Sequence, residues 1–335
     1  MHIAEGILTG KSMAVTTVAG LAVLAWGTKG MARFVSEQPE RKPLLGMAGA
    51  FIFIVSLIPI PAFTGTTSHP CGTPLAGILL GPSIAAALAF LSLLLQASFF
   101  AHGGFSSLGA NTLTLGLAGA GSAWLAFKLG RKLGMPLWAA AGLAGLLGDV
   151  ITYAAAGLML GTHLAFFAPE PKYGLGGYLS VIYAAYLPTQ GPIAIGEMLL
   201  TGYAIHSIAK QRPEVLKNLG VDGGKFKGAL LILALGLSGL GAVVQAGEMK
   251  QAVTASAPAA VVSPVSAPAT TGFPGMDEAV NEAIAHQAGA HTKDPFINLE
   301  AMGDVWNFVL LLGGGLAGFV IGRNWNQLFG KKKKD

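Results

Sequence analysis

Long apolar stretches recur along this chain of 335 residues. A helix needs roughly 20 apolar residues to cross about 30 Å of hydrocarbon. Stretches of about that length occupy residues 12–33, 43–61, 82–100 and 108–128, and further ones begin at Pro136, Gly177, Lys227 and Val305. A mean hydropathy of +0.60 and 11% charged residues exclude an ordinary soluble domain. The sequence therefore predicts an all-α polytopic membrane protein.

A shorter apolar segment, residues 73–81, decides the predicted topology. If it counts as a crossing, nearly all Lys and Arg residues fall on one side, which the positive-inside rule makes cytoplasmic. The few left outside are Lys11, Lys172, Lys250 and Lys293. We therefore expect seven crossings before Lys210, with the amino terminus outside and the Lys-rich tail, residues 331–334, inside. The predicted location is the cytoplasmic membrane.

The remaining composition narrows the classes of function. The formal charge of +5 is spread over short groups between apolar runs, so no basic stripe for nucleic acid is present. The single cysteine, Cys71, excludes an internal disulfide and a four-cysteine zinc site. No G-x-x-x-x-G-K-[ST] phosphate loop occurs, so the chain has no ATPase site of its own. We expect a protein that is not an enzyme, contacts lipid and takes energy from another subunit.

A domain boundary is predicted near residue 220. Residues 1–219 form the seven-helix bundle, and residues 220–335 a two-helix hairpin whose extracellular linker, 247–302, is rich in Ala and Pro. Residues 228–246 resemble a secretory leader, and cleavage there and an uncleaved anchor both remain open. Residues 277–286 predict a short amphipathic helix. His286 and His291 lie in this outer loop, but their spacing alone defines no site.

The first two residues carry the metal-binding chemistry. An initiator Met before a residue as large as His is usually retained, which leaves the Met1 amine beside His2. The amine and the His2 backbone nitrogen close a five-membered chelate ring, and that nitrogen and the His2 Nδ1 close a six-membered one. Such a set suits a square-planar Ni(II) or Cu(II) ion, whereas Mg(II) would prefer oxygen. One position in the plane stays open.

His69 is the candidate for the fourth position. It lies in the charge-free loop 64–72, on the same predicted side as Met1. Pro70 restricts its backbone, and the small neighbouring residues allow a peptide terminus to approach. The alternative is that His2 and His69 are incidental in a passive channel or packing subunit.

Further polar residues are candidates for orienting these ligands or the amino-terminal segment through hydrogen bonds. They are Glu5, Ser68, Gln96 and Asn111. For Gln96, and for Glu197 in a later apolar run, bonding between helices is the favoured interpretation. Both interpretations remain open for Asn111. His102 lies in an outer loop, where one interpretation is that it guides metal inward; a solvated loop side chain is the favoured one.

Four short motifs together resemble the CbiM/NikM family. They are Met1-His2-Ile3-Ala4-Glu5-Gly6, Ser68-His69-Pro70, Leu79-Leu80-Gly81-Pro82 and Leu108-Gly109-Ala110-Asn111-Thr112. The resemblance covers about residues 1–219. It implies the nickel- or cobalt-binding component of an energy-coupling-factor (ECF) transporter. It also implies a metal held by the Met1 amine, the His2 backbone and side-chain nitrogens and His69.

The same resemblance implies partners: a transmembrane coupling subunit and two cytoplasmic ATPase subunits. Residues 227–329 look more loosely like the small CbiN/NikN unit. A rival class, an intramembrane metallohydrolase, would need a motif such as H-E-x-x-H, which is absent from the sequence. The ligand set does not separate Ni(II) from Co(II) as the transported substrate.

Overall fold

The computed structural model describes residues 2–58, 60–61, 67–100, 102–221 and 277–293. The described residues are almost entirely helical, which confirms the all-α prediction. The helices are α1 (Gly10–Glu37), the 3-10 turn η1 (Pro39–Arg41), α2 (Lys42–Val55), α3 (Thr73–Leu80), α4 (Pro82–Phe99), α5 (Leu108–Asn111), the π-helical η2 (Thr112–Gly119), α6 (Ala120–Lys132), α7 (Leu137–Phe166), α8 (Leu175–Gln211), α9 (Pro213–Asn218), the π-helical η4 (Asp277–Glu282) and α11 (Ala283–Gln287). Two short strands, β1 (Ile60–Pro61) and β2 (Thr67–Ser68), pair antiparallel.

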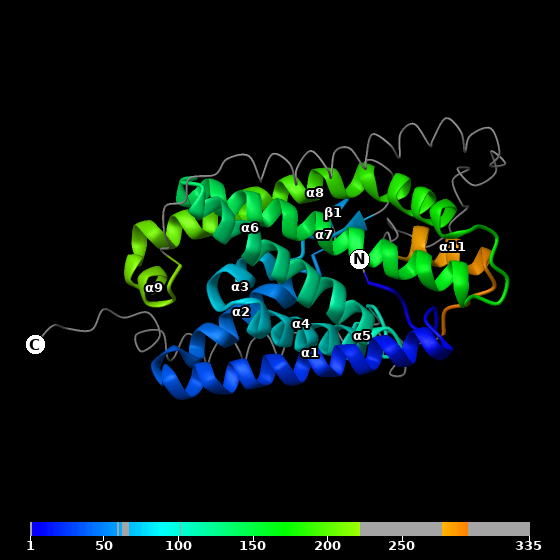
Figure 1. The fold of residues 1–335 in the computed structure, drawn as a ribbon, viewed down its shortest axis with the longest axis horizontal. Coiled ribbons are helices and arrows are strands. Elements are labelled where there is room, and N and C mark those ends of the chain that lie inside the picture. Colours follow the sequence, from blue (N-terminus) through cyan, green and yellow to red (C-terminus); the bar gives the residue numbers. More distant parts are fainter. Residues whose placement is uncertain (1, 59, 62–66, 101, 222–276, 294–335) are drawn as a thin grey trace, which may run out of the picture.

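The long helices α1, α7 and α8 run along the length of the molecule, with α9 at one end and α11 at the other (Figure 1). Each of the seven apolar stretches predicted before Lys210 contains a helix, although the stretch 43–61 is helical only to Val55 and ends in strand β1. The stretch 108–128 forms α5, η2 and α6 in direct succession. Two helices, α4 and α7, are long and apolar enough for membrane spans by length and composition.

The short segment 73–81 becomes α3, which lies inside the bundle. Its residues from Thr73 to Leu79 are all buried. It ends at Gly81, whose φ of +82° lies in the left-handed region that favours glycine, and Pro82 then begins α4. The apolar character of this segment therefore reflects packing against other helices.

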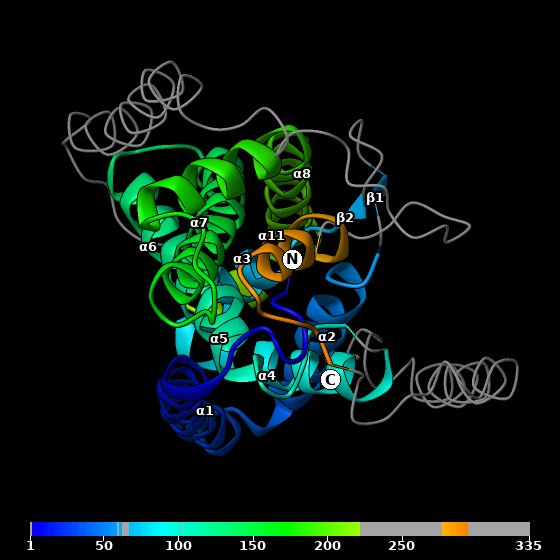
Figure 2. The ribbon, with the colours of Figure 1, turned by 90° about the vertical axis from the view of Figure 1, so that its right-hand side faces the viewer.

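The segment before α1 belongs to the hydrophobic core. Ile3, Ile7 and Leu8 are almost fully buried and pack in one cluster with residues of α7, α8 and α11. Viewed end on, the amino-terminal segment runs between the surrounding helices (Figure 2). The fold thus holds Ile3, Ile7 and Leu8 in its interior.

Of the second predicted unit, residues 220–335, the structure describes residues 220–221 and 277–293. The helix expected at 277–286 is present as η4 followed by α11. Ile284 and Ala285 are buried in the core cluster that contains Ile3, so this part of the expected linker packs against the bundle. The expected leader or anchor 228–246, the crossing from Val305 and the Lys tail lie outside the described residues.

Small residues let α1 and α5 approach closely. A Cβ added at Gly109 would lie 2.3 Å from the backbone oxygen of Thr16, and one at Gly20 would lie 2.6 Å from the Cα of Gly109. Backbone contacts this close allow no methyl group. The glycines set the distance between the two helices, as small residues do in membrane bundles.

We predict that Gly109→Ala destabilises the bundle by about 1–3 kcal/mol, because the added methyl group must push α1 away from α5. Gly121→Ala is the matched control, since a Cβ at Gly121 meets no described atom within 4 Å. Thermal unfolding in detergent measures both variants. Equal midpoints for Gly109→Ala and the unsubstituted protein would show that this contact does not limit helix packing.

Candidate metal centre

The backbone of Ile3 is clamped by α5 and the residue before it. The Ile3 N–H donates to Asn111 Oδ1 at 2.9 Å, and Asn111 Nδ2 donates to the Ile3 carbonyl at 3.2 Å. The Ser107 hydroxyl donates to the same carbonyl. These buried bonds satisfy backbone groups that would otherwise be costly to bury. Of the two interpretations of Asn111, the contacts support an anchor for the amino-terminal segment.

Glu5 holds the segment against the loop that precedes α5. Its carboxylate Oε2 accepts the Ser106 N–H at 3.1 Å, and the Gly6 N–H donates to Ser106 Oγ at 2.9 Å. A Cβ at Gly104 would lie 2.5 Å from the Glu5 Cα, so this loop lies directly against the segment. The contacts of Glu5 with Ser106 and Gly104 thus orient the peptide.

Three imidazoles meet where this segment enters the bundle. The ring centroids of His2 and His69 are 5.1 Å apart, and His102 lies 4.4 Å from His2 and 5.4 Å from His69. One possible ligand atom from each residue lies within 4.8 Å of the others. His2 and His69 are buried, with 1% and 5% of their surfaces exposed. This spacing is suitable for closing around one metal ion.

The sequence expectation for His102 is wrong, because its ring packs against the other two and is partly buried. Its Nε2 lies 3.4 Å from the Nε2 of His69. The signal available in the sequence was its position beside Gly103 in a loop on the same predicted side as His69. Gly103 has a φ of +81°, and a Cβ there would lie 3.3 Å from the His2 Cβ.

The His69 ring has a defined tautomer. Its Nδ1 lies 3.0 Å from the carbonyl oxygen of Pro70, and a carbonyl can only accept, so Nδ1 carries the proton. In the neutral ring, Nε2 then has the lone pair and is the nitrogen nearest His102. A hydrogen bond from the second nitrogen commonly orients a metal-binding histidine in this way.

Ser68 positions the His69 loop through α7 and α8. The Tyr153 hydroxyl donates to the His69 carbonyl at 3.0 Å and lies 2.9 Å from Ser68 Oγ. The Gln190 amide donates to the same serine oxygen. Ser68 was expected to support His69, and these contacts are consistent with that role.

Bonding between helices was the favoured interpretation for both Gln96 and Glu197, but the two side chains have different partners. Gln96 donates to Ser56 Oγ at 2.7 Å and so joins α4 to the end of α2, as that interpretation expects. Glu197 on α8 instead accepts the backbone N–H groups of Cys71 and Gly72 at 3.0 and 3.3 Å. It fixes the loop immediately after His69. Sequence alone could not pair a carboxylate with a loop more than 100 residues away.

The electrostatics favour a neutral His2. Burial lowers the pKa of the His2 imidazole well below its usual value, and the amino-terminal charge and the imidazoles of His102 and His69 lower it further. The ring is therefore neutral near pH 7, the form that offers a lone pair to a metal.

Three residues considered in the sequence lie away from this cluster or outside the described residues. Met1, the expected amine ligand, lies outside the described residues. His286 and His291 have ring centroids 4.8 Å apart and are exposed. Within the described ranges, only the His2, His69 and His102 group brings three potential ligands together.

We predict that Asn111→Ala loosens the amino-terminal segment, because the buried Ile3 backbone loses two hydrogen bonds worth about 1–3 kcal/mol. Amide hydrogen exchange in residues 2–8 should accelerate by about tenfold or more. Ser122→Ala is the control, since that hydroxyl bonds the Gly119 carbonyl in its own helix turn at 3.0 Å. Identical exchange in both variants would rule out the anchor.

Comparisons with known proteins all indicate the same family. A model described as CbiM, cobalt uptake substrate-specific transmembrane region, matches residues 2–215. A cobalt transport protein CbiM of Geobacter sulfurreducens is 36% identical over 340 residues, covering 99% of this chain and 91% of that protein. A putative cobalt transport protein CbiM of Methanocaldococcus jannaschii is 39% identical over 221 residues, covering 66% of this chain and 92% of its own.

Two solved structures with a similar fold agree with this family. A crystal structure described as a transition metal transporter has a TM-score of 0.56 at 25% identity, covering 67% of this chain and 100% of that one. A truncated transition metal transporter gives 0.55 at 26% identity, with coverages of 63% and 99%. The chain belongs to the CbiM family of membrane proteins, and it is a component for metal uptake rather than an enzyme.

Proposed function

We propose that this chain is the substrate-binding component of an ECF-type importer and captures cobalt or nickel with its amino terminus. The Met1 amine, the His2 backbone nitrogen, the His2 Nδ1 and the His69 Nε2 supply four nitrogens in one plane. The observation that carries the proposal is the buried meeting of His2 and His69, from segments 67 residues apart, at a ring distance of 5.1 Å. His102, whose ring centroid lies 4.4 Å from that of His2, is a neighbour of these ligands and not one of the four proposed nitrogens.

The choice of metal follows from the ligands and the relatives. Imidazole and amide nitrogens suit Co(II), Ni(II) and Cu(II) better than Mg(II). The relatives are named for cobalt transport, which supports Co(II) as a transported substrate. Nickel remains equally compatible with a planar four-nitrogen site. Because the amine and amide must lose protons to bind, metal capture releases protons and weakens in acid.

The orientation proposed is an amino terminus outside and a Lys-rich carboxyl terminus inside. Lys128, Arg131 and Lys132 line one cavity together with Asn218 of α9. Helix α9 lies at the end of the molecule away from α11 (Figure 1). The positive-inside rule favours this end as cytoplasmic. The absence of a phosphate loop from the sequence supports separate ATPase subunits, joined through a transmembrane coupling subunit.

The second unit is proposed to be a fused CbiN/NikN-like partner. Its described residues contact the amino-terminal segment directly: the Lys293 N–H donates to the Glu5 carbonyl at 3.0 Å. Tyr186 of α8 donates to Asn281 Oδ1 at 2.5 Å. These contacts support a role in loading metal into the site or in coupling it to transport.

We predict that one extra residue before Met1 abolishes high-affinity binding, because it converts the amine into an amide. Isothermal titration with Ni(II) and Co(II) measures the change, and circular dichroism checks the fold. Undiminished affinity in the extended protein would remove the amine from the site.

His69→Ala should weaken binding by more than about 100-fold, since loss of even an outer hydrogen-bond partner typically costs 10–100-fold. His102→Ala is the matched control: it removes a neighbouring imidazole but no proposed ligand. Isothermal titration of both variants with Ni(II) and Co(II) distinguishes the effect of His69 from that of His102. An equal loss in the two would require His102 in the coordination shell, and full affinity in His69→Ala would exclude His69.

Deletion from Gly228 onward should abolish cellular uptake of metal. The equilibrium affinity of the shortened protein for the metal should stay within about tenfold of that of the full chain. The physical reason is that the four proposed nitrogens all precede the deletion. Uptake of radioactive Co(II) and titration of the purified protein measure the two effects. Normal uptake by the shortened chain would contradict a role for the second unit.

A further inference from the structure

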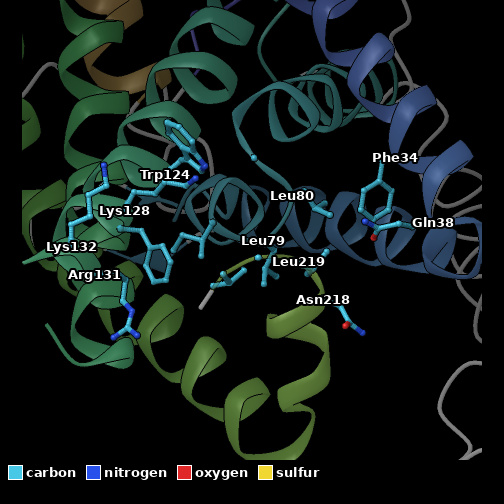
Figure 3. A pocket seen from close by; sticks show the side chains of 15 residues that line it. Phe34, Gln38, Leu79, Leu80, Trp124, Lys128, Arg131, Lys132, Asn218 and Leu219 are labelled. Carbon is cyan, nitrogen blue, oxygen red and sulfur yellow. The ribbon is translucent and has the colours of Figure 1, made fainter. Parts of the chain in front are cut away.

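A cavity of about 430 Å³ lies among the ends of α1, α3, α6 and α9, away from the three histidines (Figure 3). Its floor is apolar and includes Leu79, Leu80 and Phe127. Its basic side chains all come from the last turns of α6: Lys128, Arg131 and Lys132. None of its 15 described lining residues is acidic.

Arg131 is held in place with part of its hydrogen-bonding capacity unused. Its terminal nitrogen Nη1 donates to the Met135 carbonyl at 2.8 Å. Its Nε is buried and has no hydrogen-bond partner among the described residues. A buried donor on a charged group is costly to leave unsatisfied. Arg131 therefore places a fixed cation in the cavity lining.

Lys128 is also positioned. Its Nζ lies 4.6 Å from the centroid of the Trp124 ring, within range of a cation–π interaction. Trp124 lines the cavity as well. This contact places an ammonium group beside an amphipathic aromatic ring, a residue type enriched where membrane meets water.

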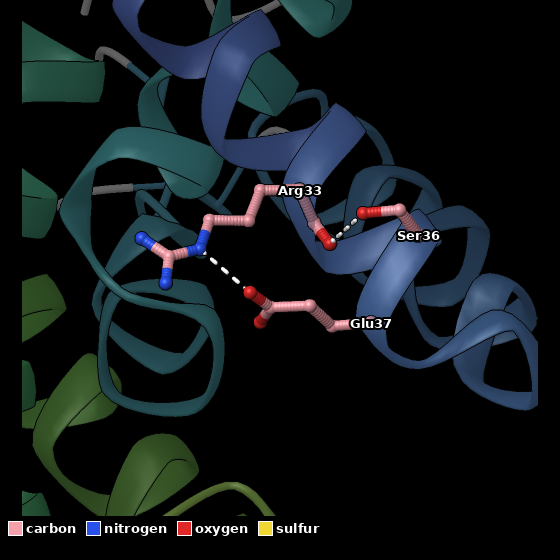
Figure 4. A network of polar contacts seen from close by, with 3 residues as sticks. All are labelled: Arg33, Ser36 and Glu37. Atoms are coloured by element: carbon pink, nitrogen blue, oxygen red, sulfur yellow. Dashed lines mark hydrogen bonds and ion pairs between the residues drawn. The ribbon is translucent and has the colours of Figure 1, made fainter.

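The acidic residues near the mouth already have cationic neighbours. Glu37 accepts from Arg33 Nε at 2.7 Å at the end of α1 (Figure 4). Glu40 lies 3.6 Å from Arg41 Nε. Three lining cations thus have no acidic counterpart in the lining, and the site favours an anion.

We propose that this cavity binds the headgroup of an anionic phospholipid, with the headgroup among the basic side chains of α6 and the start of an acyl chain on the apolar floor. The combination of cations and an apolar floor distinguishes this occupant from a free phosphate, which would use only the cations. Basic pockets between membrane helices recognise anionic headgroups in this way. The inference is independent of the proposed metal site.

The test uses the full chain in nanodiscs of phosphatidylcholine with increasing phosphatidylglycerol. Native mass spectrometry counts retained lipid, and thermal unfolding reports stabilisation. Arg131→Gln should weaken phosphatidylglycerol binding by about tenfold to 100-fold, because it removes a charged hydrogen-bond donor. The control Lys42→Gln, an exposed cation outside the cavity lining, should bind as the unsubstituted protein does.

A double variant, Lys128→Gln with Lys132→Gln, keeps the test valid if Arg131→Gln fails to fold; it should also lose lipid. Three results would overturn the proposal. The first is equal phosphatidylglycerol binding in all variants. The second is equal stabilisation by soluble glycerol phosphate in pure phosphatidylcholine. The third is unchanged lipid binding with loss of a coupling subunit in co-purification, which would assign the cavity to a protein partner.

Discussion

Burial of the amino-terminal peptide is the constraint on which the rest of the site depends. A chain end and an imidazole are costly to place in an apolar interior unless their polar groups are satisfied. Here Asn111 and Ser107 bond the backbone of Ile3, and Ile3 itself packs in the core. His2 is thereby held with its ring centroid 5.1 Å from that of His69. The same packing explains how a peptide terminus could serve as a ligand.

Two separate sets of contacts bring His69 to this point. Tyr153 bonds its carbonyl from α7, while Glu197 on α8 bonds the backbone of the residues that follow. α7 and α8 therefore position one side of the site, and α5 positions the other. A relative movement of these helices would change the distance between the two histidines. Such an arrangement suits a protein that must both hold and release its substrate.

Sequence reasoning predicted the helices well because they lie in apolar stretches of the chain, most of them about as long as a membrane crossing requires. It also brought His2 and His69 together, since short-range chelate geometry and a shared side of the membrane are readable from order alone. It did not predict His102 in the cluster or Glu197 beneath the His69 loop. Those contacts depend on how helices distant in sequence pack, and a single sequence carries no direct signal for that.

The coordination shell of the bound metal tests the central claim most directly. X-ray absorption spectroscopy on the Ni(II)-loaded chain with its native amino terminus reports the type and number of ligands. The account predicts four nitrogens in a planar arrangement, the geometry that Ni(II) adopts with such donors. An octahedral shell rich in oxygen, with no more than two nitrogens, would contradict a site built from the amino terminus and two imidazoles.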